Sequence, residues 1–504
     1  MTLIKGVKIV DGTGKKEPYQ ADLLINANKI AAIGKFPNKK ADIVIDGLGL
    51  YVAPGFIDVN TDSDHHLSLF TNPVQQDFLI QGVTTIFGGL CGSSLAPLIY
   101  GGLESVRKWT DITQVNVNWR TVGEFLKILD NLGLGINFGT FIGHSTIRRG
   151  LIGDEPRDLS IDELNKFKSV LKENLGEGAF GFSTGLGYAL SRRVPYNEIR
   201  ELAKLVGKAG GIYATHLRNE REGLLSSVEE TLKLAKETQT KVIINHFKPI
   251  VGFEKEYLKG LELIHEINSE VDIHFDNYPF AESVVTIHSL LPDWAQVGNL
   301  EIMLSYLRNE MTRGRLVEEF GRFNGNEIKI AQAVGRDYLV GKTLREFSEN
   351  QGLSVAEGLI KLMLLTGLRA LVIYKNINYD LVVQNLERDR AFIASNGASL
   401  PPGFKIFKHE RFYNTFPKFL EIVLQRKSLS LPQAIEKITS APAKKFNLKN
   451  RGFVKEESIA DLCVFSFKSG RVRVEHVFVN GRLALRDREI TGERNGAILR
   501  NVKA

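Results

Sequence analysis

Eight short apolar runs, each followed by a helical pattern, constrain the fold of the central part of this chain. The runs are GFIDVNTD, VTTIFGG, INFGTFIGH, AFGFSTG, IYATH, KVIINHF, VDIHFDNYP and AFIASNG. Strands that alternate with helices are typical of parallel βα units. Eight units are the number that closes a TIM-like (β/α)8 barrel, in which the active site gathers at the carboxyl ends of the strands. The sequence therefore predicts an α/β fold of this kind.

The two ends of the chain have a different, β-rich pattern. Asp11-Gly12 marks a turn near the N-terminus, and Asn480-Gly481 between apolar runs predicts a two-residue hairpin. Because neither end is long enough to close a core alone, residues 1–50 and 440–504 are predicted to form one small β-sandwich domain together. Residues 51–439 would then form the barrel. The segment at about 281–390 is too long for one crossover helix, which predicts an inserted helical subdomain over the barrel mouth.

The charge distribution, the apolar segments and the cysteine content indicate which partners and which cellular compartment to expect. The chain has 504 residues, a formal charge of +7, and basic residues scattered among nearly as many acids. No basic cluster with interleaved aromatic residues is present, so we expect no nucleic-acid partner. Lys361 and Arg369 interrupt the most apolar segment, which predicts a core helix and strand and no membrane partner. Cys91 and Cys463 are the only cysteines and form no CxxC motif, which favours a reducing cytoplasm.

Three residues that can ligate a metal stand at the ends of predicted barrel strands. They are Cys91, His216 and His246, and each comes from a different strand. The carboxyl ends of barrel strands meet at one mouth, so these side chains are expected to converge. Thiolate and imidazole are ligands that zinc accepts in tetrahedral geometry. The sequence predicts a bound metal there.

The first barrel strand carries further polar residues. Asn60 and Asp62 are two residues apart and therefore project to one face. The following residues, Asp64 to His66, are interpreted as a solvated loop rather than as ligands. His144 ends the third run, where it either orients the strand end by hydrogen bonds or contacts a substrate.

Motifs along almost the whole chain resemble the amidohydrolase superfamily, specifically its D-aminoacylase (N-acyl-D-amino-acid deacylase) branch. They include APGFIDV, QGVTTIFGGLCGSSLAPL, GHSTIR, GAFGFSTGLGY, GGIYATHLRNE, DNYPF, ITSAPAKKFNL and VEHVFVNGRLALRDREITGERNG, all in one order. The resemblance implies a β-sandwich with a TIM-type barrel, a zinc cofactor, and hydrolysis of the amide bond of N-acylated D-amino acids through a zinc-activated water.

The resemblance also assigns roles to residues, with substitutions at the catalytic positions. The tightly held zinc of the family uses a Cys and two His, which match Cys91, His216 and His246. The His-x-His of the family falls on Asn60 and Asp62, so one ion is expected and a second site is doubtful. The catalytic Asp of the family falls on Asn396, whose amide has no useful basicity. Asp62 is the candidate for a replacement base.

The positions that hold the substrate are better retained. Arg411 matches an Arg that pairs with the substrate carboxylate in the family, a task suited to a planar guanidinium. Lys248 and Tyr278 match positions that line the same pocket. The implied partner is a small acylated amino acid or a similar amide.

Three interpretations of function remain open from the sequence. The first is a metal-dependent hydrolase of the carbon–nitrogen bond in N-acylated D-amino acids or related amides. The second is a pseudoenzyme that binds zinc and an acyl amino acid or peptide without efficient hydrolysis. The third is a structural or partner-binding barrel with a residual metal site. We favour the first.

Overall fold

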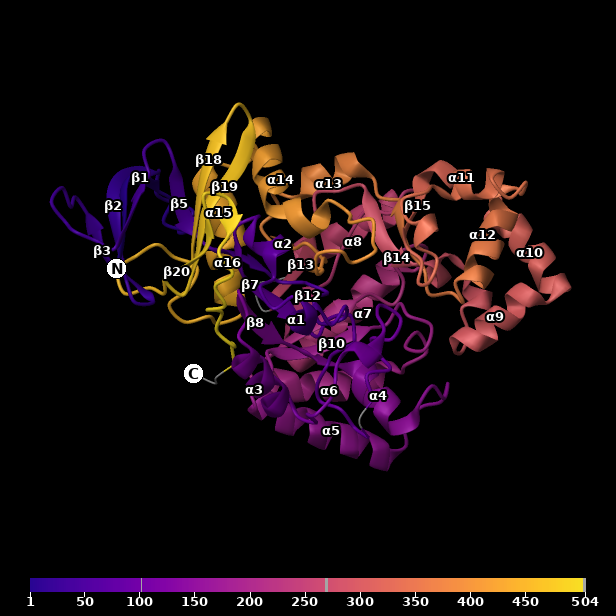
Figure 1. Ribbon diagram of the computed structural model, residues 1–504. Helices are drawn as coiled ribbons and strands as arrows, with labels where there is room; N and C mark the ends of the chain where they lie inside the picture. The colour runs from indigo at the N-terminus through magenta and orange to yellow at the C-terminus, as the bar shows by residue number, and fades with distance from the viewer. Residues whose placement is uncertain (101, 268–270, 502–504) are drawn as a thin grey trace.

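A ring of short buried strands lies at the centre of the computed structural model, which describes residues 1–100, 102–267 and 271–501 (Figure 1). Each strand coincides with one of the eight apolar runs. The strands are β6 (Phe56–Asp58), β7 (Val83–Gly88), β8 (Asn137–Thr140), β9 (Ile142–Gly143), β10 (Gly181–Gly185), β11 (Ile212–His216), β12 (Lys241–Ile244), β13 (Ile273–Asn277) and β17 (Ala391–Ile393).

Backbone pairing shows how the ring closes. The strands form two parallel sheets in the orders β6-β7-β8 and β17-β13-β12-β11-β10-β9. Only Phe141 separates β8 from β9, so these two act as one interrupted strand that joins the sheets. At the other seam Thr61 bridges to Gly397, and the Asn396 N–H donates to the Asn60 carbonyl over 2.9 Å. The predicted barrel fold is confirmed, with eight strand positions.

Helices pack around this ring and begin where the sequence offers caps. Thr121 and Ser160 form capping boxes with Glu124 and Glu163, which satisfy the first N–H groups of α3 and α5. Apolar faces of these helices pack on the strands in one large core cluster. The helices of the barrel part are α1 (Ser68–Thr71), α2 (Gln76–Leu79), α3 (Val122–Leu132), α4 (His144–Ile152), α5 (Ile161–Gly176), α6 (Tyr196–Lys208), α7 (Leu224–Thr238), α8 (Glu254–Glu266), α14 (Arg411–Arg426), α15 (Leu431–Ile438) and α16 (Ser440–Lys445).

Both chain ends contribute to one nine-stranded sheet. β5 pairs antiparallel with β18, which joins the N-terminal and C-terminal strands (Figure 1). Asn480 and Gly481 both have positive φ and connect β19 to β20, as the hairpin signal predicts. The strands are β1 (Thr2–Ile9), β2 (Tyr19–Asn26), β3 (Lys29–Gly34), β4 (Ile43–Asp46), β5 (Tyr51–Pro54), β18 (Leu462–Lys468), β19 (Arg471–Val479), β20 (Arg482–Arg486) and β21 (Glu489–Ile490).

The segment between β13 and β17 contains both helices and a sheet. Its strands β14 (Glu282–Thr286), β16 (Leu371–Lys375) and β15 (Ile328–Gln332) pair antiparallel in that order. Its helices α9 (Leu300–Arg308), α10 (Glu310–Phe320), α11 (Leu344–Glu349) and α12 (Val355–Leu365) share a separate hydrophobic cluster; α13 (Tyr379–Asn385) leads back to the barrel. The expected helical insertion therefore also has a three-stranded sheet. The domain limits at residues 50, 281, 390 and 440 stay predictions.

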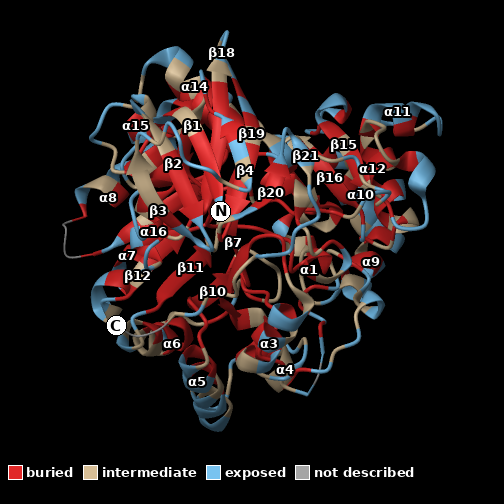
Figure 2. Cartoon of the chain, turned by 60° about the vertical axis from the view of Figure 1, so that its left-hand side comes forward, coloured by how far each residue is buried: buried red, intermediate tan, exposed pale blue. Residues whose placement is uncertain are grey.

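Burial follows the same arrangement. Figure 2 shows the barrel and terminal-sheet strands largely buried, whereas the outer helices keep exposed faces. The apolar segment interrupted by Lys361 and Arg369 forms α12 and β16, as predicted. None of the described helices has the length and apolar character that crossing a membrane requires.

Candidate metal centre and active-site cavity

The structure brings Cys91, His216 and His246 together at the carboxyl ends of the barrel strands. Cys91 follows β7, His216 ends β11 and His246 follows β12. Cys91 Sγ lies 3.4 Å from His246 Nε2, and one ligand atom from each residue lies within 4.8 Å of the others. Tetrahedral coordination with bonds of roughly 2.0–2.3 Å separates ligand atoms by roughly 3.5 Å. The three side chains therefore have the spacing of a metal site.

The surroundings favour the forms of these residues that bind a cation. Burial lowers the pKa of His216 to about 3, so its imidazole is neutral, and its Nδ1 is buried without a hydrogen-bond partner. Burial, with the charges of Asp62 and Asp276, raises the pKa of the Cys91 thiol well above its usual value. A cation is therefore needed to stabilise a thiolate there.

Glu220 orients the second imidazole and was missed from the sequence. Its Oε1 lies 2.9 Å from His246 Nδ1, which turns His246 Nε2 toward Cys91. Although burial opposes ionisation, the charge of Lys248 and the hydrogen bond with His246 hold the pKa of Glu220 well below its usual value. Glu220 stands four residues after His216 in HLRNE, so its position in that motif was the available signal.

Three residues that follow barrel strands have a left-handed backbone conformation, and two of them are candidate metal ligands. Cys91, His246 and Asn396 have φ of 50°, 39° and 44°. Residues other than glycine adopt this region rarely, and such outliers cluster at functional sites. Asn396 lies after β17 and lines the same cavity as the three candidate ligands.

Asn60 and Asp62 follow β6, which ends at Asp58 and is therefore shorter than the predicted strand, and the two residues have separate partners. Asn60 Nδ2 donates to both carboxylate oxygens of Asp276 over 3.2 Å, and Asn245 Nδ2 donates to Asp276 over 2.8 Å. Asp62 lines the cavity, and its Oδ1 lies 2.9 Å from His65 Nδ1. The structure therefore directs Asn60 to Asp276 and Asp62 to the cavity.

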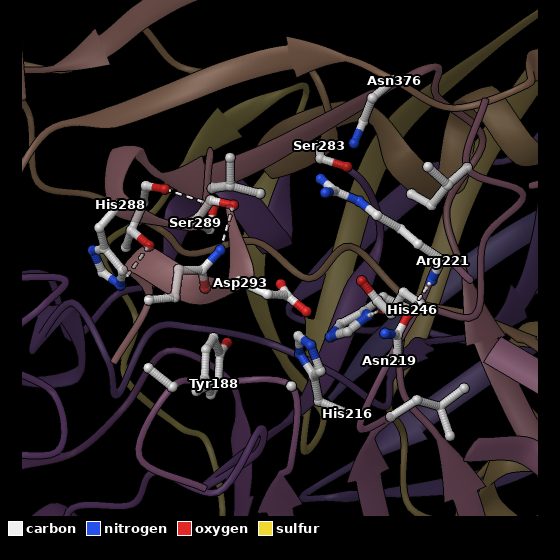
Figure 3. A pocket seen from close by; sticks show the side chains of 18 of the residues that line it. Tyr188, His216, Asn219, Arg221, His246, Ser283, His288, Ser289, Asp293 and Asn376 are labelled. Carbon is white, nitrogen blue, oxygen red and sulfur yellow. Dashed lines mark hydrogen bonds and ion pairs between the residues drawn. The ribbon is translucent and has the colours of Figure 1, made fainter. Parts of the chain in front are cut away.

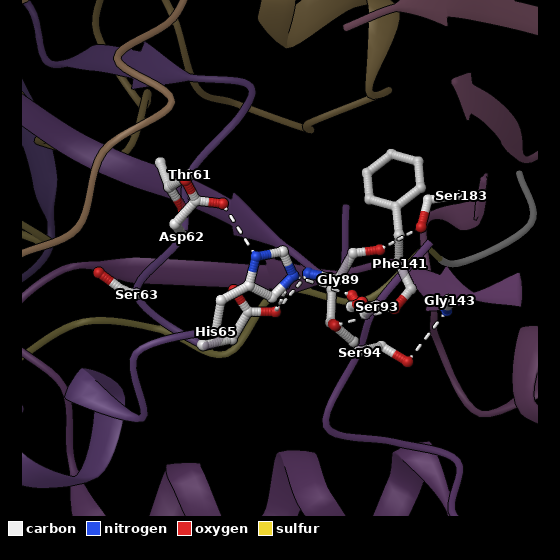
Figure 4. A network of polar contacts seen from close by, with 12 residues as sticks. Thr61, Asp62, Ser63, His65, Gly89, Ser93, Ser94, Phe141, Gly143 and Ser183 are labelled. Carbon is white, nitrogen blue, oxygen red and sulfur yellow. Dashed lines mark hydrogen bonds and ion pairs between the residues drawn. The ribbon is translucent and has the colours of Figure 1, made fainter. Parts of the chain in front are cut away.

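The loop of Asp64 to His66 is buried, so the expectation of a solvated loop is wrong. Asp64 and His65 are each 1% exposed. Asp64 accepts a hydrogen bond from the Gly89 N–H over 2.6 Å, and His65 Nε2 contacts the Ser93 carbonyl at 3.1 Å (Figure 4). The loop is buried because it packs against the turn that carries Cys91.

The three predicted substrate-binding residues line the same cavity. Arg411, at the start of α14, is 3% exposed, and its Nε and Nη1 have no partner among the described residues. Its guanidinium lies 5.2 Å from the ring centroid of Tyr278, whose hydroxyl is also buried without a partner. Lys248 Nζ lies 3.5 Å from Glu220 Oε2. A buried guanidinium with free donors is suited to an anionic group of a ligand.

The cavity has a volume of about 500 Å³, within the range of small-molecule pockets. The strand ends form one side, and residues of the segment between β13 and β17, such as Ser283, His288 and Asp293, form the other (Figure 3). Residues of this segment therefore contribute part of the cavity wall.

Lys108 and Tyr188 are further residues near the site that the sequence did not single out. Lys108 Nζ lies 3.4 Å from the Tyr188 ring centroid, and burial lowers the pKa of Lys108 to about 7. Lys108 lies in a long loop without periodicity, which gave no signal. His144 Nε2 lies 2.7 Å from Glu198 Oε1, and His144 does not line the cavity. Its hydrogen bond therefore holds the start of α4 against α6.

Comparisons with known proteins agree with this architecture. No protein-family model matches the chain. D-aminoacylase of Alcaligenes xylosoxydans xylosoxydans is 28% identical over 100% of this chain and 98% of its own. N-acyl-D-aspartate deacylase of the same organism is 27% identical over 99% of this chain and 94% of its own.

Solved structures give the same result. A D-aminoacylase crystal structure has a TM-score of 0.79 at 26% identity and covers 99% of both chains. An N-acyl-D-glutamate deacylase of Bordetella bronchiseptica, complexed with zinc and a phosphonate mimic of the tetrahedral intermediate, has a TM-score of 0.82 and 99% coverage of both chains. At 24% identity it supports the fold alone. A further D-aminoacylase structure, at 25% identity, concerns a binuclear metal centre.

The fold and the cavity are similar to those of the amidohydrolases, a class of hydrolases that includes D-aminoacylase. More particularly, the chain is a homologue of the D-aminoacylases and related N-acyl-D-amino-acid deacylases over its full length. The resemblance predicted from the motifs is confirmed.

Proposed function

We propose that this protein hydrolyses the amide bond of N-acylated D-amino acids, with one metal ion held by Cys91, His216 and His246. The observation that carries the proposal is the convergence of these three ligands in a cavity that also contains the unpaired guanidinium of Arg411. The D-aminoacylase relatives supply the reaction class.

The residues present fit one zinc ion. They offer one sulfur and two imidazole nitrogens, the unpartnered Nδ1 of His216 and the Glu220 contact to His246. Such a ligand set is typical of catalytic zinc, which keeps a position open for water or substrate. When bound, the ion supplies Lewis-acid polarisation of the scissile carbonyl and a lowered pKa for water.

The residues that match the His-x-His of the family do not fit a second ion. Asn60 is neutral and its amide is committed to Asp276. Asp62 is committed through Oδ1 to His65, whose pKa rises to about 9 because Asp64 and Asp62 outweigh the effect of burial. The His65 imidazolium therefore already supplies a positive charge beside Asp62.

Arg411 and Tyr278 would orient the substrate. The free N–H groups of Arg411 are suited to the α-carboxylate, and the unpartnered Tyr278 hydroxyl lies within reach of the same group or of the acyl oxygen. Lys248, 3.5 Å from Glu220, adds positive charge to this part of the cavity. Fixing the carboxylate places the amide toward the strand ends, where the ligands lie.

Asp62 would move the proton. Burial opposes its ionisation, but the hydrogen bond from His65 and the charges of His65 and Arg411 keep the pKa of Asp62 below its usual value. Its Oδ2 has no partner among the described residues. Oδ2 therefore accepts a proton from the attacking water and returns it to the leaving nitrogen. Asn396 can position groups but cannot accept a proton.

The second candidate function is a pseudoenzyme that binds acyl amino acids. The amide of Asn396 at the position of the family carboxylate favours it. We also propose a cytoplasmic location, because both cysteines are free thiols.

One experiment separates the two candidates. Zinc-loaded protein is assayed for free amino acid released from N-acetyl-D-methionine and its L-enantiomer, beside chelator-treated protein and Asp62→Asn. The hydrolase predicts release from the D-substrate that chelation abolishes and Asp62→Asn lowers by about 10²–10⁴-fold. An inert wild type whose melting temperature still rises with the D-substrate, but not in Arg411→Ala, supports the pseudoenzyme.

A further inference from the structure

Most cationic side chains around the cavity are neutralised by a neighbouring carboxylate, but three are not. Arg192, Arg218 and Arg315 each lie within 3.2 Å of an acidic oxygen. Arg411, Arg221 and Arg322 have no ion-pair partner among the residues that the structure describes, and of these only Arg322 is exposed. Because an unpaired guanidinium shielded from solvent at a cavity wall is a binding group for anions, this cavity offers two such groups, Arg411 and Arg221.

Arg221 lies on a different wall from the candidate metal ligands. It follows Glu220 in the loop between β11 and α7 and is partly buried. Figure 3 shows its side chain extending toward Ser283 and Asn376, above His216. Both of those residues belong to the β14 and β16 region of the insertion.

The wall that Arg221 faces is polar and has unsatisfied groups. In the antiparallel register Ser283 pairs with Tyr374, so Ser283 and Asn376, two residues beyond Tyr374, project from the same face. Ser283 is 1% exposed and its Oγ has no hydrogen-bond partner in the described structure. Figure 3 shows the amide nitrogen of Asn376 turned toward Ser283. Buried polar groups without partners are costly, and at a cavity wall they indicate a polar ligand group.

We propose that Arg221, Ser283 and Asn376 form a second anion subsite, which makes the preferred substrate an N-acylated dicarboxylic amino acid of the aspartate or glutamate type. This inference rests on the proposed function, because Arg411 takes the α-carboxylate and Arg221 takes the side-chain carboxylate. Arg221 donates through its fork, Ser283 through its hydroxyl and Asn376 through Nδ2. A neutral apolar side chain would leave these groups unpaired, and sites built for polar groups reject such analogues strongly.

The test compares two ligands of the same shape and different charge. Binding of N-acetyl-D-glutamate and N-acetyl-D-glutamine to zinc-loaded protein is measured by calorimetry, or as kcat/KM where turnover occurs. The wild type is expected to prefer the glutamate derivative roughly 10- to 100-fold, the range of a hydrogen-bonded charge. Arg221→Ala is expected to remove this preference while binding the glutamine derivative within about twofold of wild type.

Arg322→Ala is the matched control, since Arg322 also lines the cavity but is exposed. It should keep the preference, and Arg221→Lys should retain part of it. Equal affinity of the wild type for both ligands overturns the subsite, as does loss of preference in Arg322→Ala but not in Arg221→Ala. If neither ligand nor N-acetyl-D-methionine binds, the proposed function itself fails, and the subsite with it.

Discussion

His246 Nδ1 lies 2.9 Å from Glu220 Oε1, so a carboxylate holds the ring that presents Nε2 to Cys91. Partners of this kind typically raise metal affinity or activity about 10–100-fold. Glu220→Gln is therefore expected to weaken zinc binding by about that factor, measured by competition with a chelator. Glu222→Gln, an exposed neighbour on the same loop, should bind zinc as wild type does. Equal affinity in both variants would remove the orienting role of Glu220.

A small substitution next to a ligand should also disturb the metal site. A Cβ at Gly187 would lie 2.6 Å from His216 Nε2, closer than real side-chain contacts. Gly187→Ala is expected to lower zinc content well below one ion per chain, because His216 must turn away. Gly176→Ala is the control, since its Cβ would meet no atom within 4 Å. Elemental analysis after gel filtration measures both, and full zinc content in Gly187→Ala would contradict the geometry.

The number of bound ions is expected to follow from the hydrogen bonds of the residues just after the first barrel strand. Since Asn60 donates to Asp276 and Asp62 pairs with His65, wild-type protein is expected to take up one tightly bound zinc ion per chain. The triple variant Asn60→His, Asp62→His, Asn396→Asp should take up two. Two tight ions in the wild type, measured by titration into metal-free protein, would show that the amide network does not block the second position.

Restoring a carboxylate at position 396 should raise turnover. Asn396 lines the cavity but has no basic group, whereas an aspartate there supplies a second proton acceptor. Asn396→Asp is expected to raise kcat for an N-acetyl-D-amino acid by at least about tenfold, the lower part of what a general base contributes. Asn396→Ser tests whether loss of the amide alone has this effect. A lower kcat in Asn396→Asp would mean that Asp62 already acts without hindrance.

The ion pair of His65 should make stability depend on pH. Burial acts against protonation, but Asp64 and Asp62 raise the pKa of His65 to about 9 in the folded state. The native state therefore binds more protons than the unfolded state above pH 6.5, and stability falls as pH rises. This stabilisation is complete below about pH 6.5 and is lost through pH 9, a change of about 3 kcal/mol. Denaturant unfolding at pH 6 and 9.5 should show it in wild type and not in His65→Gln.

The barrel and the candidate ligands were accessible from the sequence because strand ends have a fixed geometry. Each apolar run stops at a polar residue, and parallel strands bring their carboxyl ends to one mouth, so Cys91, His216 and His246 could be placed together without knowledge of distances. The hairpin at Asn480-Gly481 was equally readable, because two positive φ values favour that pair.

The burial and the contacts of the loop residues could not be predicted from the sequence in the same way. Asp64 and His65 look like surface residues, and only a tertiary contact, the Gly89 N–H donated to Asp64, buries them. Glu220 and Arg221 lie in a short loop, and their contacts are with distant parts of the chain. Glu220 contacts the imidazole of His246, which follows another strand, and Arg221 extends toward Ser283 (Figure 3). The antiparallel sheet of β14, β15 and β16 joins runs far apart in sequence, which a periodic pattern does not reveal.

The positive φ values of Cys91, His246 and Asn396 have a consequence for engineering the protein. Glycine adopts this backbone region without strain, so glycine at any of these corners is expected to be tolerated by the fold. The same change would remove a sulfur, an imidazole or an amide from the cavity wall. Stabilising these corners and keeping the groups that bind a ligand are therefore opposing aims.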